Sequence, residues 1–255
     1  MRKIFFCSLF FSLLYSCKKD SNILKFNTPI LSDYIKSVKN QFALTQQLIA
    51  CAASTDIADP EQITFPLSVF YLPVNGAYDF KYFEMNSNGI DHNNYENYTF
   101  KNLKNVPEFN GYLGRFKGKV EKDTWCVVTY KTPGKLHICN PIKIKHFSQP
   151  TLFASQVISV QNNGTQPKFI WIDSSSINNS IYFQVVSDAS NNLISGTYTH
   201  DKHWSFYNLS NVVLNIRNVI PIPSLKNATK YNFTLMGVSV DNWVNLAGQR
   251  EFITP

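Results

Sequence analysis

Alternating apolar and polar positions predict β-strands along most of this chain. In the segment 78–85, the aromatic side chains of Tyr78, Phe80 and Tyr82 alternate with the charged side chains of Asp79 and Lys81, as in a strand with one buried face. Similar segments recur with turn residues between them, at the spacing of roughly 8–12 residues that is typical of β-sandwiches. These segments are residues 67–72, 112–116, 124–130, 135–139, 141–145, 169–172, 181–186, 193–199, 204–207, 212–216, 231–240 and 249–253.

The segment before these strands has a mixed pattern. Ser32 and Asp33 are typical helix caps, and apolar side chains follow at helical spacing up to Phe42. Residues 48–53 suit a buried strand equally well, so the period leaves helix and strand open there. The favoured interpretation is a short helix up to about residue 46, followed by a strand.

Composition supports a mostly β fold. Aromatic residues make up 15% and charged residues 16% of the 255 positions, and Val, Ile, Phe, Tyr and Thr dominate the apolar segments. The length is sufficient for two domains with separate cores, and a polar segment around Pro150 divides them. We therefore predict two tandem antiparallel β-sandwiches, at residues 32–147 and 148–255.

A corner motif lies in the second predicted sandwich. It reads Leu225-Lys226-Asn227-Ala228-Thr229-Lys230-Tyr231 and precedes a strand. The run resembles the E–F corner of fibronectin type III and immunoglobulin-like domains, although Asn227 stands where proline is usual. The resemblance covers about residues 165–255 and supports a fold, not an activity. It implies that the Tyr231 hydroxyl bonds to the corner backbone, that Leu225 fills the core, and that Trp171 is the early tryptophan of the fold.

The chain begins with an apolar leader that ends at a cysteine. A positively charged start precedes an apolar run at residues 4–14, which is too short to span a membrane, and Ser16-Cys17 follows. This arrangement resembles the leader of bacterial lipoproteins, although Tyr15 stands where a small or β-branched residue is usual. An ordinary cleaved leader with an incidental thiol at Cys17 is the alternative.

The lipoprotein resemblance implies a location. Residues 1–16 would be removed, Cys17 would carry acyl chains, and residues 17–31 would form a lipidated tether. The protein would then be held at the outer membrane, on either its periplasmic or its cell-surface face.

Three cysteines, Cys51, Cys126 and Cys139, remain after Cys17. A hairpin with a four-residue loop at 131–134 places Cys126 opposite Cys139, at a Cα separation near the short limit for a disulfide. Two buried free thiols are the alternative.

The charge pattern argues against nucleic acid as a partner. The net charge is +7 before the leader is removed, but the lysines are scattered and there are only four arginines, at positions 2, 115, 217 and 250. A nucleic-acid surface needs clustered basic residues on one face.

Aromatic side chains near predicted loops are the candidate ligand-binding residues. Tyr198, His200, His203 and Trp204 lie close together in the sequence, and Trp243 lies among Asp and Asn residues. Flat rings beside amides suit a sugar-binding surface, because the ring covers the apolar face of a sugar while the amides bond its hydroxyls. The alternative is that these rings cover the sandwich core.

No metal site, cofactor or catalytic motif is predicted. His200 and His203 flank an aspartate, but they lie in strand-like sequence without an evident third ligand, so they are interpreted as exposed turn residues. Neither a serine-nucleophile motif nor a phosphate-binding glycine loop occurs. The favoured function is a non-catalytic, lipid-anchored envelope module that binds a glycan or another envelope protein, or acts as a scaffold. The alternative is an envelope glycoside hydrolase, or another hydrolase, that uses loop carboxylates.

Overall fold

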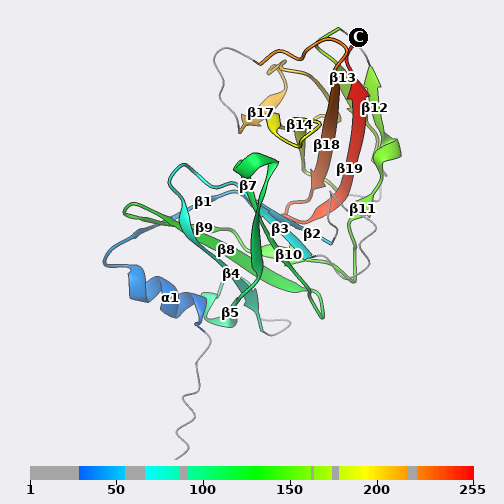
Figure 1. Cartoon of the computed structure of the whole chain (residues 1–255). Coiled ribbons are helices and arrows are strands. Elements are labelled where there is room, and N and C mark those ends of the chain that lie inside the picture. Colours follow the sequence, from blue (N-terminus) through cyan, green and yellow to red (C-terminus); the bar gives the residue numbers. More distant parts are fainter. Residues whose placement is uncertain (1–28, 55–66, 87–90, 162–163, 174–177, 217–222) are drawn as a thin grey trace, which may run out of the picture.

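The computed structural model describes residues 29–54, 67–86, 91–161, 164–173, 178–216 and 223–255. It confirms the prediction of a mostly β chain with two sandwiches, each made of two sheets (Figure 1). The predicted leader, Cys17 and nearly all of the tether lie outside the described residues. Within the described ranges, no helix has the length and apolar character that crossing a membrane requires.

The first sandwich consists of a six-stranded sheet, here sheet I, and a four-stranded sheet, here sheet II. Most neighbouring strands are antiparallel, but the edge strand β1 runs parallel to β9. Sheet I has the order β1 (Ala43–Leu48), β9 (Lys135–Cys139), β8 (Thr124–Thr132), β4 (Tyr78–Met85) and β5 (Tyr98–Lys101), with β10 (Ile142–Ile144) beside β8, and sheet II has the order β2 (Ala50–Ala53), β3 (Leu67–Tyr71), β7 (Leu113–Gly118) and β6 (Lys104–Glu108).

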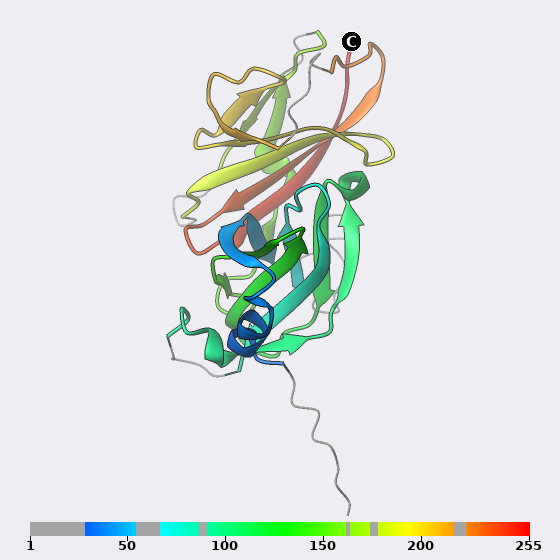
Figure 2. The same cartoon turned by 90° about the vertical axis from the view of Figure 1, so that its left-hand side faces the viewer.

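The second sandwich consists of a six-stranded sheet III and a three-stranded sheet IV. Figure 2 shows it stacked beyond the first sandwich, on the side away from α1. We retain the division at residue 147 as a proposal. Sheet III has the order β11 (Leu152–Phe153), β19 (Val244–Ile253), β18 (Lys230–Val238), β14 (Ile181–Asp188), β15 (Leu193–Thr199) and β17 (Val212–Asn215), and sheet IV has the order β12 (Ile158–Gln161), β13 (Lys168–Trp171) and β16 (His203–Ser205).

The predicted N-terminal helix is shorter than expected and starts differently. It ends at Val38 rather than near residue 46, and its N-cap is Ile30, which makes no side-chain capping bond. The fully buried Leu31 begins the helix. The following residues leave the helix because the Ala43 amide donates to the Gly134 carbonyl, 2.9 Å away, and β1 joins the edge of sheet I. The helices are α1 (Leu31–Val38) and the short 3-10 helices η1 (Tyr95–Asn97), η2 (Phe109–Gly111) and η3 (Ser155–Val157).

The predicted β8–β9 hairpin forms, but its register is wrong by two residues. The strands join through a two-residue turn, with Thr132 opposite Lys135, instead of a four-residue loop. Strand β8 continues to Thr132 because Lys131 pairs with Tyr78 of β4, and the Lys131 ammonium lies 2.9 Å from the Asp79 carboxylate. The long-range pairing of β8 with β4 therefore fixes the turn.

This register removes the expected pairing of the two cysteines. Cys126 lies opposite Ile142 of β10, and the Sγ of Cys139 accepts from the amide of Val128 at 3.1 Å. Cys126, Cys139 and Cys51 are all free thiols. A diagonal cross-strand neighbour lies about 7–8 Å away between Cα atoms, beyond the usual span of a disulfide.

The predicted corner in the second sandwich is confirmed. The Tyr231 hydroxyl accepts a hydrogen bond from the Lys226 backbone amide at 2.9 Å, which closes the turn before β18. Leu225 is buried in the same core as Tyr231 and Trp171. Together with the two-sheet architecture, this corner makes the second sandwich immunoglobulin-like.

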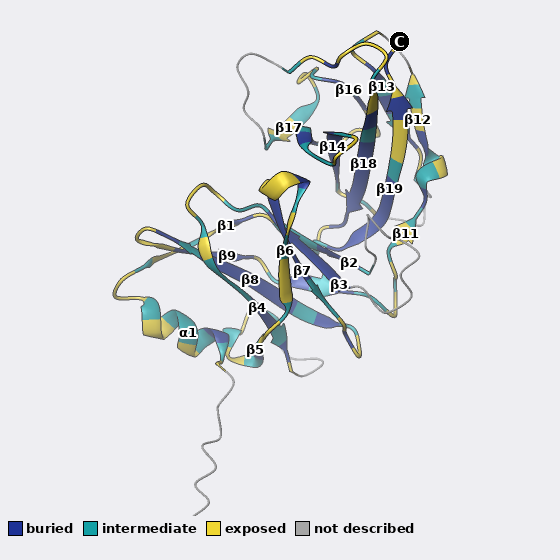
Figure 3. Ribbon diagram, viewed as in Figure 1, coloured by how far each residue is buried: buried dark blue, intermediate teal, exposed yellow. Residues whose placement is uncertain are grey.

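The two sandwiches share a third core at their junction. Phe70 and Leu113 of sheet II pack in one buried cluster with Phe183, Met236 and Val238 of sheet III. Strands β3 and β18 are therefore buried on both faces, as Figure 3 shows for β18. Their near-continuous apolar sequences follow from this two-sided burial.

Polar contacts frame the same junction. The Ser54 and Thr151 side chains and amides bond reciprocally at 2.7 and 2.9 Å. The Lys143 amide donates to the Asp241 carbonyl at 3.0 Å, and the Lys145 ammonium lies 2.7 Å from the Asp241 carboxylate. The contacts of Lys143 and Lys145 tie β10 and the residue after it to the β18–β19 turn.

Candidate functional site

The structure contradicts the prediction that Trp204 is a surface platform. Its side chain is only 1% exposed and lies in the core of the second sandwich. Its ring stacks on Phe169 at a centroid distance of 6.0 Å, and its indole N–H donates to the Asn208 carbonyl at 3.0 Å. Trp204 therefore packs between the sheets, where no ligand reaches it.

Trp243 is also buried, and it belongs to the core of the other sandwich. It precedes β19 of the second sandwich, yet its fully buried side chain lies in the core of the first. Its indole N–H donates to the Gln149 carbonyl at 2.8 Å, and its backbone forms a parallel bridge with Ala52 of β2. Trp243 is thus an interdomain plug and does not form the predicted sugar-binding surface.

The remaining residues of the predicted platform do not gather. Tyr198 lies on β15 of sheet III, whereas His203 lies on β16 of sheet IV. His200 and His203 are exposed, and the Nδ1 of His200 lies 2.9 Å from the Ser180 carbonyl oxygen. No group of three or more potential metal ligands occurs among the described residues.

Two of the buried or half-buried acids face basic side chains, whereas Glu84 accepts from the Tyr82 hydroxyl at 2.8 Å and burial raises its pKa. Asp173 pairs with Lys202, and Glu108 pairs with Arg115 at 2.7 Å between Oε1 and Nε. In each pair the basic side chain compensates the charge of the carboxylate. The two ion pairs hold their carboxylates in structural contacts.

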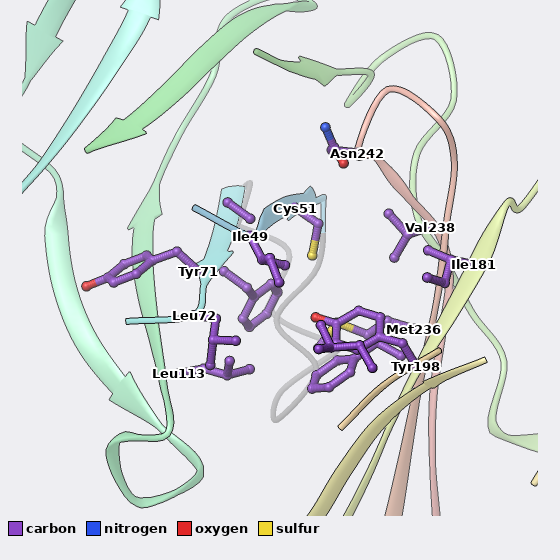
Figure 4. A pocket seen from close by; sticks show the side chains of 14 residues that line it. Ile49, Cys51, Tyr71, Leu72, Leu113, Ile181, Tyr198, Met236, Val238 and Asn242 are labelled. Carbon is purple, nitrogen blue, oxygen red and sulfur yellow. The ribbon is translucent and has the colours of Figure 1, made fainter. Parts of the chain in front are cut away.

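A cavity of about 250 Å³ lies between the two sandwiches, and the sequence analysis did not predict it. Figure 4 shows side chains from both sandwiches around it. Sheet II and its neighbouring residues contribute Ile49, Ala50, Cys51, Phe70, Tyr71, Leu72 and Leu113, and sheet III with its turn contributes Ile181, Phe183, Tyr198, Leu214, Met236, Val238 and Asn242.

Among the predicted site residues that the structure describes, Tyr198 alone lines this cavity. Its ring stacks on Phe183 at a centroid distance of 4.5 Å, which holds it against sheet III. The Cys51 sulfur and the Tyr198 hydroxyl point into the space from opposite sandwiches, whereas the Tyr71 hydroxyl points away (Figure 4). The Tyr71 hydroxyl instead donates to the Asn105 side chain at 2.8 Å.

The polar groups of the cavity are neutral. Burial raises the pKa of the Cys51 thiol to about 12. Burial, followed by the nearby Cys51, raises the pKa of the Tyr198 hydroxyl well above its usual range. Because the thiolate is the reactive form, Cys51 is a poor nucleophile at neutral pH. The arrangement suits binding of an uncharged group and not covalent chemistry.

A second, more polar hollow of about 530 Å³ adjoins the cavity at Leu72. It is formed by the turn after β3, by η2, and by Ile216 of the second sandwich. Gly76 in this turn has a φ of 79°, a conformation that glycine adopts without strain. The hollow extends the junction between the sandwiches toward solvent.

The sequence contained one weak signal for this site. The run at residues 67–72 is almost continuously apolar instead of alternating, which indicates a strand covered on both faces. It does not say what covers the second face. The partners from sheet III lie more than a hundred positions away in the chain.

Comparisons with known proteins give only remote likenesses. No protein-family model matches the chain. No curated protein matches it either. Among solved structures, it is similar to the FN1–FN3 domains of chicken CNTN1, with 11% identity and a TM-score of 0.29 over 84% of this chain, and it spans 65% of that chain.

Two further solved structures are similar at the same level. A two-domain fibronectin type III segment of chicken tenascin has 13% identity and a TM-score of 0.26, covering 82% of this chain and 98% of the other. The chicken interferon gamma receptor alpha chain has 9% identity and a TM-score of 0.25, covering 81% and 97%. These likenesses are too remote to carry a function to this protein.

Proposed function

We propose that this protein is a lipid-anchored module of a bacterial envelope that binds or scaffolds without catalysis. The observation that carries the proposal is the apolar leader ending in Ser16-Cys17. In this proposal residues 1–16 are removed, acylated Cys17 holds the chain at the outer membrane, and residues 17–31 form a tether.

The joined sandwiches support a binding or scaffold role. Domains in one chain move relative to each other by default unless a large apolar interface joins them. Here the core shared by sheets II and III and the plug formed by Trp243 join them. A tether followed by one two-sandwich body suits a module that presents a surface at a fixed geometry.

Lipidation is tested by replacing Cys17 with Ser. The wild-type chain should enter the detergent-rich phase of a detergent that separates on warming. The Cys17→Ser chain should remain in the aqueous phase or keep its leader. Cys7→Ser is the matched control, because Cys7 lies inside the apolar run and should leave partitioning unchanged. Intact-mass analysis of the mature chain should show the acyl groups on Cys17. An unmodified N-terminus would contradict the proposal.

The more specific sugar-binding hypothesis loses its original basis, because Trp204 and Trp243 are both buried. Another envelope protein remains a proposed partner. The interdomain cavity is the feature of the described residues that best suits a bound molecule.

A further inference from the structure

The size of the interdomain cavity exceeds what defects in packing usually leave. Protein interiors rarely contain voids much larger than a water molecule. An engineered apolar cavity of about 150 Å³ stays dry and binds benzene. The cavity at this junction measures about 250 Å³, so it has room for a molecule larger than a single aromatic ring.

The lining defines the charge of the occupant. The described lining residues include no Asp, Glu, Lys, Arg or His. The pKa of Cys51 and that of Tyr198 are both raised by burial, so neither side chain is charged at neutral pH. A buried ion without a partner is strongly disfavoured, and this cavity therefore selects against ligands that carry a charge.

The Tyr198 hydroxyl is a polar group of the cavity without a hydrogen-bond partner among the described residues, and the side-chain amide of Asn242 is another. Among the described residues, none accepts from or donates to the Tyr198 hydroxyl, which points into the cavity from the sandwich opposite Cys51 (Figure 4). Tyr198 is half-buried and its hydroxyl is not among the fully buried polar atoms of the described residues, so water can reach it in the free protein, and a ligand group that bonds to it takes the place of that water. Tyr198 thus provides one directional contact within an apolar surface.

The cavity has a rim through which a small molecule can enter. Ile49 and Leu214 both line it, and each is 38% exposed. They come from opposite sandwiches, so the opening lies along the line where the two bodies meet. Leu214 lies on the edge strand β17, so its side chain is an accessible position at which to close the opening.

We infer that this cavity binds a small, uncharged, mostly apolar molecule whose single hydroxyl or carbonyl group bonds to Tyr198. A bicyclic alcohol or phenol represents the class. The inference rests on the binding role in the proposed function and is independent of the lipid on Cys17. A failure here would leave the phase-partitioning result unaffected, so the two proposals can fail separately.

The test is a calorimetric titration of the full chain in detergent solution with α-naphthol, after subtraction of a titration into detergent alone. We expect saturable binding of α-naphthol and binding at least about tenfold weaker for α-naphthoate, whose carboxylate would be buried without a counter-charge. No binding above the detergent background, or equal binding of the anion, would overturn the inference.

Two variants locate the binding. Leu214→Trp should close the rim and weaken α-naphthol binding by about tenfold or more, whereas Val240→Trp, at a residue that is 83% exposed and outside the lining, should not. Tyr198→Phe should weaken α-naphthol about five- to tenfold while leaving naphthalene unchanged, since only the hydroxyl contact is lost. Equal affinities for Leu214→Trp and the unmodified chain would place the binding elsewhere and overturn the inference.

Discussion

The junction between the two sandwiches has a filled half and a hollow half. In the filled half, the side chain of Trp243 is fully buried in the core of the first sandwich, although its backbone belongs to the second. The Gln149 carbonyl accepts a hydrogen bond from its indole N–H. In the hollow half, Tyr198 and Cys51 face each other across a cavity of about 250 Å³. Both halves are lined with large apolar and aromatic side chains.

The difference shows that side-chain type alone does not determine whether a junction closes. Trp243 sits on a tight turn between β18 and β19, and its backbone bridge with Ala52 brings the two sandwiches together there. Tyr198 lies on β15, where its ring stacks on Phe183 of the same sheet. The filled half therefore holds the sandwiches together, while the hollow half leaves space for a ligand.

Removal of the plug should have the largest effect. Trp243→Ala should lower the free energy of unfolding by about 3–5 kcal/mol, because it removes a large buried side chain and leaves a cavity. Urea denaturation followed by circular dichroism measures this loss. Val240→Ala, at an 83% exposed position just before the same turn, should cost less than about 0.5 kcal/mol. A loss below about 1 kcal/mol for Trp243→Ala would contradict the claim that Trp243 holds the two sandwiches together.

A contact held by charge should differ from the apolar plug in its pH dependence. Asp79 joins Lys81, Lys131 and Tyr34 where α1 packs on sheet I. Burial disfavours the charged form of Asp79, but hydrogen bonds and charge from Lys81 and Lys131 outweigh it and lower its pKa to about 2.

Because this pKa is lower in the folded chain than the ordinary value of 3.8, the stabilisation is complete above that value. It is lost as the pH falls from about 4 toward 2. Asp79→Asn should therefore cost on the order of 1–2 kcal/mol at pH 7 and little near pH 2, whereas the cost of Trp243→Ala should change little. Asn suits the φ of 54° at this position. Urea denaturation at several pH values measures both; a cost of Asp79→Asn that is constant with pH would contradict the charge assignment.

The next largest effect is expected at the corner tyrosine. Tyr231→Phe should lower the free energy of unfolding by about 1 kcal/mol, because it removes the acceptor of the Lys226 amide and keeps the ring. Chemical denaturation measures the change. Unaltered stability would show that the corner bond contributes nothing.

The smallest effect is expected for the same substitution in the cavity. Tyr198→Phe should change the free energy of unfolding by less than about 0.5 kcal/mol, because no described residue bonds to the Tyr198 hydroxyl. Tyr231→Phe is its matched control, since both changes remove one oxygen. A loss at Tyr198 as large as at Tyr231 would mean that the cavity hydroxyl already has a partner in the free protein.

Features set by local sequence could be predicted. The corner from Leu225 to Tyr231 forms within seven residues, and its geometry follows from the turn and the reach of one hydroxyl. Alternation of aromatic and charged side chains likewise identified β4. These signals are local, so the rest of the molecule had little opportunity to override them.

Features set by distant contacts could not. The β8–β9 turn depends on Lys131 meeting Tyr78 and Asp79 of β4, which the hairpin sequence does not reveal. The helical spacing of apolar residues continues to Phe42, but the helix ends at Val38 because β1 pairs with the edge of sheet I. The cavity needs both sandwiches at once, and a tryptophan near a turn looks the same in sequence whether it faces water or a neighbouring core.

Scanning calorimetry of the full chain tests most directly whether the two sandwiches form one cooperative body. If the Trp243 plug and the shared core make the two sandwiches one body, we expect a single transition whose calorimetric enthalpy equals its van't Hoff enthalpy. Two separate transitions, or a calorimetric enthalpy well above the van't Hoff value, would contradict the claim that the sandwiches are joined through a common core.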